Sequence, residues 1–222
     1  MENINTQYQT RLCTAEAVAE KVQPGWVCCS DIATAIPPAL LAALQKRLQS
    51  GELSDISYHS LLDLFPLPGL EGTPGVCNTS WFSGGWARKA VNGGAADIMP
   101  CHYRDIPALF SRYVPIDAYF AVVSPMDEHG CFSTGLSASI SEALVAKAKH
   151  IYLEVNENMP RVASGPQIHI SQVDALCVNN APLPAKLPGE IDETSRTIGG
   201  LIAEEIGNGS TLQLGIGAIP DA

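Results

Sequence analysis

The sequence has little positive charge. Among its 222 residues, 13 lysines and arginines stand against 23 aspartates and glutamates, which gives a formal net charge of −10. A protein that tracks a nucleic-acid backbone, or that binds an anionic membrane surface, needs the opposite balance, so we expect neither partner. An anionic ligand can still bind, provided that a local pocket holds it and not the overall field.

Long hydrophobic runs and metal-binding spacings are also missing. The longest apolar run, residues 32–44, is too short to span a bilayer and contains two prolines, so we expect no membrane segment. The seven cysteines include no Cys-x-x-Cys pair and there is no His-Glu-x-x-His motif, so we expect no metal site. The odd cysteine number and the polar first residues, which do not form a leader peptide, predict a cytoplasmic protein with reduced thiols.

Helix and strand patterns alternate along the chain. With 46% hydrophobic residues the chain can bury a sizeable core, and the alternation favours an α/β fold with a mostly parallel sheet and flanking helices. Strands are expected at 26–30, 55–59, 76–82, 96–99, 118–123 and 151–155, and helices at 14–22, 37–49, 86–91, 107–113, 139–149 and 192–206. Residues 65–75 hold three prolines and three glycines and are expected to form a surface loop.

Two distant passages follow the same order of elements. Residues 18–25 (VAEKVQPG) precede a strand and the helix start Ile36-Pro37-Pro38. Residues 202–209 (IAEEIGNG) likewise precede a predicted strand and Ile219-Pro220. The repeated order predicts that a second copy of the fold begins near residue 190.

This repeat divides the chain into two predicted parts. We expect an N-terminal α/β domain over residues 1–187, then a linker and the truncated start of a second, similar domain over residues 188–222. A strand and a few helical turns cannot bury their own apolar faces, so the last part needs further structure to pack against. The alternative is one complete α/β domain whose C-terminal helix and strand dock on its own sheet. The sequence alone leaves both open.

Polar side chains gather after several predicted strands, where α/β sheets bind ligands. The candidates, in chain order, are Ser30 and Asp31, Pro100 and His102, Glu128 and His129, and Asn156 and Asn158. Spacing alone favours an ordinary solvated turn at Glu128 and His129. Their common position after strands nevertheless suggests one shared edge of the sheet.

Residues 212–220 (LQLGIGAIP) predict a strand, a Gly-x-Gly turn and a helix start. Glycines let a ligand approach the backbone, and a helix N-terminus offers unpaired N–H groups to a phosphate or an oxyanion. The third glycine of the dinucleotide motif is absent, and no Gly-Lys-Ser/Thr follows as in a P-loop. The turn alone is therefore a weak signal.

Together with three other segments, this turn resembles the acetyl-CoA hydrolase/transferase family, above all its 4-hydroxybutyrate and butyryl-CoA:acetate CoA-transferases. The segments are residues 122–130 (VVSPMDEHG), 154–160 (EVNENMP), 168–171 (IHIS) and 212–222 (LQLGIGAIPDA). The family has two similar α/β halves around the active site. The resemblance therefore implies a CoA-transferase-like fold of which this chain supplies the N-terminal half.

The resemblance also implies a reaction. CoA would move between a short-chain acyl-CoA (4-hydroxybutyryl-, butyryl- or acetyl-CoA) and a carboxylic acid, through a glutamyl-CoA thioester. The family's glutamate lies beyond Ala222, so we expect no catalytic residue in this chain, which would be inactive alone. Coenzyme A is a substrate here, and no permanently bound cofactor is expected. An acyl-CoA hydrolase, or a non-catalytic subunit that needs a partner chain, are the alternatives.

The resemblance assigns roles to particular residues. The family's CoA-binding turn matches Gly215, Ile216, Gly217, Ala218 and Ile219. The eight strand-end candidates named above would line the substrate cleft from the first half. The loop at residues 30–34 lacks a Gly-x-Gly and is expected to shape the substrate side of the cleft. The intact protein is expected to be a homo-oligomer, specifically a homodimer.

Overall fold

The structure is a computed structural model that describes residues 3–185 and 189–222. Its residues cluster into two compact units, an N-terminal unit that ends at Pro184 and a C-terminal unit that begins at Ala185. The predicted domain boundary between residues 187 and 188 lies outside the described residues.

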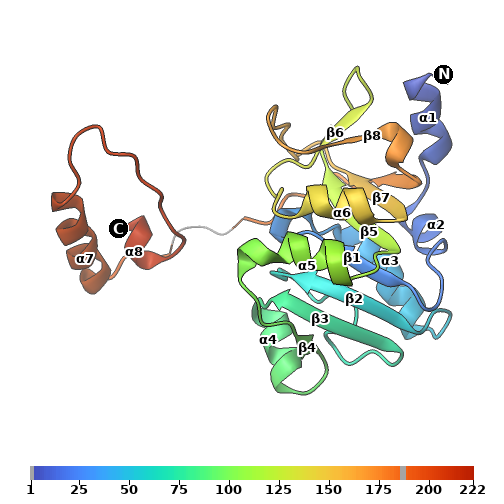
Figure 1. Cartoon of the computed structure of the whole chain (residues 1–222), viewed down its shortest axis with the longest axis horizontal. Coiled ribbons are helices and arrows are strands. Elements are labelled where there is room, and N and C mark those ends of the chain that lie inside the picture. Colours follow the sequence, from blue (N-terminus) through green and yellow to red (C-terminus); the bar gives the residue numbers. More distant parts are fainter. Residues whose placement is uncertain (1–2, 186–188) are drawn as a thin grey trace. The chain divides into compact units, whose positions relative to one another are not determined.

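The N-terminal unit is built on a seven-stranded sheet (Figure 1). In sheet order its strands are β4 (Asp97–Ile98), β3 (Val76–Phe82), β2 (Ile56–Leu61), β1 (Val27–Ser30), β5 (Ala118–Val123), β7 (His150–Val155) and β9 (Ala175–Val178). Every neighbouring pair runs parallel, so the carboxyl ends of all seven strands lie at one edge. The strand order changes direction between β1 and β5, which is the switch point where such sheets bind ligands.

Helices and short turns connect these strands. The helices are α1 (Ile4–Arg11), α2 (Ala15–Ala19), α3 (Pro38–Gln49), α4 (Gly85–Asn92), α5 (Ile106–Tyr113) and α6 (Ser141–Lys147). Three 3-10 turns are η1 (Ala33–Ala35), η2 (Tyr103–Asp105) and η3 (Ile170–Gln172), and an antiparallel pair, β6 (Cys131–Ser133) and β8 (Gln167–His169), forms a second small sheet. The predicted α/β class with a mostly parallel sheet is confirmed.

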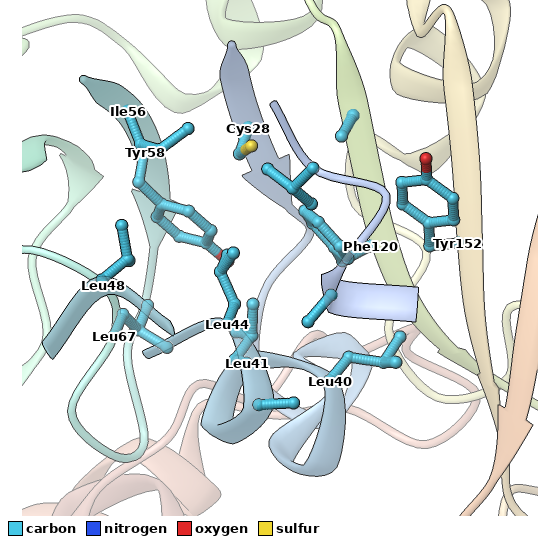
Figure 2. Packing of buried hydrophobic residues seen from close by; sticks show 14 of the residues in the cluster. Cys28, Leu40, Leu41, Leu44, Leu48, Ile56, Tyr58, Leu67, Phe120 and Tyr152 are labelled. Atoms are coloured by element: carbon cyan, nitrogen blue, oxygen red, sulfur yellow. The ribbon is translucent and has the colours of Figure 1, made fainter. Parts of the chain in front are cut away.

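Each face of the large sheet has its own hydrophobic core. On one face the leucines of α3 pack against Tyr58 of β2 and Phe120 of β5, as Figure 2 shows. On the other face Phe110 of α5 and Leu144 of α6 pack against the alternate residues of the same strands. Burying one such side chain stabilises a fold by about 1.5–3 kcal/mol, so α3 and α5 hold the sheet from both sides.

The helix and strand pattern predicts most elements of the N-terminal unit. The strands at residues 76–82 and 118–123 are confirmed over their full length, and Thr14 does cap α2 through its side chain. The sequence missed α1, β6, β8 and β9, of which α1 is polar and β6 and β8 have three residues each. The expected surface loop at 65–75 is partly wrong, because Leu67 and Leu70 are buried.

The C-terminal unit contains two helices, α7 (Glu193–Glu204) and α8 (Ala218–Asp221). The strand predicted from residue 212 is wrong, because residues 210–215 form no strand. A strand needs a neighbour to pair with, and the described part of this unit offers none. All seven strands of the large sheet precede residue 179. The alternative of a C-terminal helix and strand that dock on the first sheet stays a prediction.

In residues 3–185 and 189–222, no helix combines the length and the apolar character needed to cross a bilayer.

One partly buried histidine, His59, gives the stability of the N-terminal unit a dependence on pH. Trp81 Nε1 donates to His59 Nδ1 at 2.8 Å, and the ring of Phe110 meets the imidazole edge-on. Burial lowers the pKa of His59 from 6.5 to about 4. The neutral imidazole is therefore the form that the fold accommodates.

We predict that the free energy of unfolding falls as the pH drops below 6.5. In that range His59 is protonated in the unfolded chain but stays neutral in the folded protein. The contribution is intact above pH 6.5, and about 2 kcal/mol is lost between pH 7.5 and pH 5. His59→Gln keeps an acceptor for Trp81 but does not titrate. Urea unfolding of both proteins at both pH values measures the difference, and an equal loss in the two would contradict the prediction.

Candidate functional site

The end of β1 and the loop after it lie at the switch point and hold two of the predicted site residues. Ser30 and Asp31 are both fully buried. Ser30 Oγ accepts from the Tyr58 hydroxyl at 2.9 Å. The Asp31 carboxylate accepts from the backbone N–H of Ile140 at 3.0 Å and from the Ser141 hydroxyl at 2.6 Å. Burial raises the pKa of the Asp31 carboxyl, and these hydrogen bonds oppose that rise. Asp31 thus binds the first turn of α6.

Glu154 of β7 plays the same part for α3. Its carboxylate accepts from the N–H groups of Ala39 at 2.9 Å and Leu40 at 3.0 Å, and from the Asn179 side chain at 2.7 Å. The N-cap residue Pro37 makes no side-chain cap of its own. Burial raises the pKa of Glu154, and the bonds from Leu40, Asn179 and Ala39 oppose that rise. The hydrogen bonds of this carboxylate therefore support the fold.

Asp63, after β2, completes the pattern and was missed by the sequence analysis. Its carboxylate accepts from the backbone N–H groups of Gly84 at 2.8 Å, Trp86 at 2.7 Å and Ala87 at 3.3 Å, which form the first turn of α4. We call Asp31, Asp63 and Glu154 the capping carboxylates. The signal that could have found them is a helix start without its own Ser, Thr, Asp or Asn cap.

The capping carboxylates decide which helix N-termini can hold an anion. The N-terminal N–H groups of α3, α4 and α6 already bind a buried carboxylate, and none of these helices has a local side-chain cap. A phosphate would have to displace that carboxylate, so these helix starts are not free anion sites.

Asn156 and Asn158 follow β7 and hold the chain after β9. The Asn156 amide donates to the Ala181 carbonyl at 2.9 Å, and the Asn158 amide donates to the Asn180 carbonyl at 2.9 Å. Asn156 is buried and Asn158 is exposed. Both residues lie at the expected edge, and their recorded bonds are to this protein's own backbone.

Glu128 and His129 lie in the turn between β5 and β6. Their side chains are 87% and 79% exposed, and His129 Nε2 lies 3.7 Å from Glu128 Oε1. The neighbouring Asp127 shapes the turn by accepting from the N–H groups of His129 and Cys131. This geometry fits a solvated turn.

Pro100 and His102 follow the edge strand β4, and both are exposed. The next residue, Tyr103, has its ring centroid 6.0 Å from that of Phe82, and both of these aromatic residues are exposed. In sheet order β4 and β7 are five strand spacings apart, or about 24 Å. The structure therefore places the eight cleft candidates along one edge but does not gather them into one small pocket.

The predicted CoA-binding turn belongs to the C-terminal unit. Gly217 has φ +144°, a conformation that residues with a side chain rarely adopt, and it precedes the first residue of α8. Ile216 is 91% exposed. A cavity of about 330 Å³ lies against this turn, and its apolar lining includes Ile202, Ile206, Leu214 and Ile219.

Within the part of the chain that the structure describes, no three His, Cys, Asp or Glu residues are grouped so that they could hold a metal ion.

Comparison with known proteins identifies related sequences. The family model described as the acetyl-CoA hydrolase/transferase N-terminal domain matches residues 1–187. The butyryl-CoA:acetate CoA-transferase of Anaerostipes caccae is 36% identical over an alignment of 225 positions, which covers 97% of this chain and 50% of that protein. The succinyl-CoA:cyclohexane-1-carboxylate CoA transferase of Geobacter metallireducens is 33% identical over 218 residues, or 97% of this chain and 49% of that protein.

Solved structures give the same relationship. RipA from Yersinia pestis matches with a TM-score of 0.90 at 28% identity, over 99% of this chain and 54% of that chain. The 4-hydroxybutyrate CoA-transferase from Porphyromonas gingivalis matches with a TM-score of 0.75 at 29% identity, over 98% of this chain and 51% of that chain. This chain spans about half the length of the curated relatives it matches.

We predict that Glu154→Ala destabilises the N-terminal unit by about 2–4 kcal/mol, because three donors would lose a buried charged acceptor. The same change at the exposed Glu128 should leave the free energy of unfolding unchanged. Urea unfolding of the two variants beside the unsubstituted chain is the measurement. Equal stability of both variants would show that Glu154 does not hold α3.

Proposed function

The chain belongs to the acetyl-CoA hydrolase/transferase family, and from this premise we propose that it is the N-terminal half of a CoA-transferase. The observation that supports this most is the match of 97% of the chain to half of each of two CoA-transferases. The substrates we propose are a short-chain acyl-CoA (4-hydroxybutyryl-, butyryl- or acetyl-CoA) and a carboxylic acid.

The proposed reaction conserves the thioester energy. A glutamate carboxylate oxygen attacks the thioester carbonyl carbon. The carbon–sulfur bond breaks, so that the CoA thiolate departs and an anhydride between the acyl group and the glutamate is formed. The thiolate then attacks the glutamyl carbonyl carbon, releases the first acid as a carboxylate, and forms glutamyl-CoA. The second acid reverses these steps and takes the CoA. We propose that this glutamate lies beyond Ala222. The hydrogen bonds that the Glu154 carboxylate accepts from α3 support the exclusion of Glu154 as the nucleophile.

Each unit carries its own candidate binding residues. The open φ +144° turn at Gly217 supports the proposal that Gly215 to Ile219 bind CoA, because no side chain blocks the backbone there. In the N-terminal unit, we favour His102 among the cleft candidates for contact with an apolar acyl group, because it is exposed and precedes Tyr103, whose exposed ring pairs with that of Phe82. Ser30 and Asp31 would support this cleft from within.

We further propose that residues 188–222 begin a second, similar domain. Its supporting observation is exposed apolar surface, with Leu201 62%, Leu214 73% and Ile216 91% exposed. Such side chains normally pack in a core. Chain beyond Ala222, or a partner chain, would cover them.

We predict that the 222-residue chain alone does not exchange CoA between butyryl-CoA and acetate, because it lacks the nucleophile. The same chain joined to a second half from its reading frame should produce acetyl-CoA only when acetate is added. Chromatography of the CoA esters measures both. Exchange by the 222-residue chain alone would contradict the proposal, and release of free CoA without acetate would favour the hydrolase.

We also predict that residues 1–184 fold alone. Removing residues 185–222 should leave the urea midpoint of the N-terminal unit unchanged, because its two cores lie within residues up to 184. The deletion should also reduce the fluorescence of an added hydrophobic dye, because it removes the exposed side chains of the C-terminal unit. A lowered midpoint would show that residues 185–222 are part of the first domain.

A further inference from the structure

Two non-glycine residues at the carboxyl edge have a left-handed backbone. Ala33 follows β1 with φ +52°, and Leu62 follows β2 with φ +34°. Neither side chain can hydrogen-bond to the backbone, and for a bulky residue such as leucine this conformation is a rare outlier. Among the described residues the third such case, Asp55 at φ +58°, lies at the opposite edge before β2, and aspartate tolerates it.

The surrounding structure holds Ala33 in place from both sides. Before it, Asp31 is fixed by its bonds to α6. After it, the Thr34 and Ser137 hydroxyls lie 2.7 Å apart, and Glu154 holds the first turn of α3. These bonds fix the residues on both sides of Ala33.

Leu62 is held in the same way. Its N–H donates to the Phe82 carbonyl at 2.6 Å, and the next residue, Asp63, binds the first turn of α4. The register between β2 and β3 shifts at Ser60 and Leu61, immediately before it. Such bulges redirect a strand end and are frequent beside active sites.

We propose that Ala33 and Leu62 are positioning residues, whose left-handed backbone aims the loops after β1 and β2 at the substrate bound beside the switch point. Strain of this kind costs stability and persists where a site uses the geometry it gives. Glycine would adopt both conformations without strain, but it would also let the loops move. The inference rests on the proposed CoA transfer for its substrate.

The test compares alanine with glycine at each position, so that only the Cβ differs. The pairs are the unsubstituted Ala33 and Ala33→Gly, Leu62→Ala and Leu62→Gly, and, as the control at the opposite edge, Asp55→Ala and Asp55→Gly. At all three positions glycine should lower the equilibrium constant of unfolding of the 222-residue chain by about threefold relative to alanine. In the transferase joined to its second half, glycine at 33 or 62 should lower kcat at least about tenfold with little change in KM. The Asp55 pair should have equal kcat.

Two results would overturn the inference. If the variants with glycine at 33 or 62 are no more stable than those with alanine there, the backbone is not strained at these positions. Glycine variants that keep full kcat in an active parent would show that the strain does not serve the reaction. A parent that transfers no CoA is a different result, because it overturns the proposed function itself and this role with it.

Discussion

The buried carboxylate at a helix N-terminus is the interaction on which the carboxyl edge of this protein depends. Pro37, Gly84 and Ile140 stand at the N-caps of α3, α4 and α6 and provide no side-chain cap. The capping carboxylates reach these helices from the ends of β7, β2 and β1. One contact thereby satisfies the orphan N–H groups of a helix and joins it to a distant strand.

The hydrogen bonds of the capping carboxylates distinguish residues that support the fold from residues that are free to bind a ligand. A carboxylate that already accepts two or three structural hydrogen bonds in a buried place cannot turn to attack a thioester without freeing a helix. Acidic residues at a switch point are therefore not a sufficient sign of catalysis. In this family member the exposed groups at the edge, such as His102, and the open glycine turn at Gly217 are the better candidates for substrate contact.

The sequence predicts the elements far better than the contacts between them. Apolar periodicity gives β3, β5 and α3 almost to the residue, because each is decided by its own side chains. The caps of α3 and α6 lie more than 100 residues away in sequence, so no local pattern reports them. The failed strand after residue 210 has the same cause, because a strand exists only with a partner. The eight cleft candidates are correctly placed at strand ends, but the strand order that spreads them apart cannot be read from one sequence.

The position of the covalent intermediate would show whether the nucleophile lies outside residues 1–222. The transferase that contains this chain and its second half would be incubated with butyryl-CoA and quenched with hydroxylamine, which converts a glutamyl-CoA thioester into a stable hydroxamate. Peptide mass mapping then locates the modified residue. We expect a single modified glutamate beyond Ala222, with Glu128 and Glu154 unmodified. A hydroxamate on any residue from 1 to 222 would contradict it.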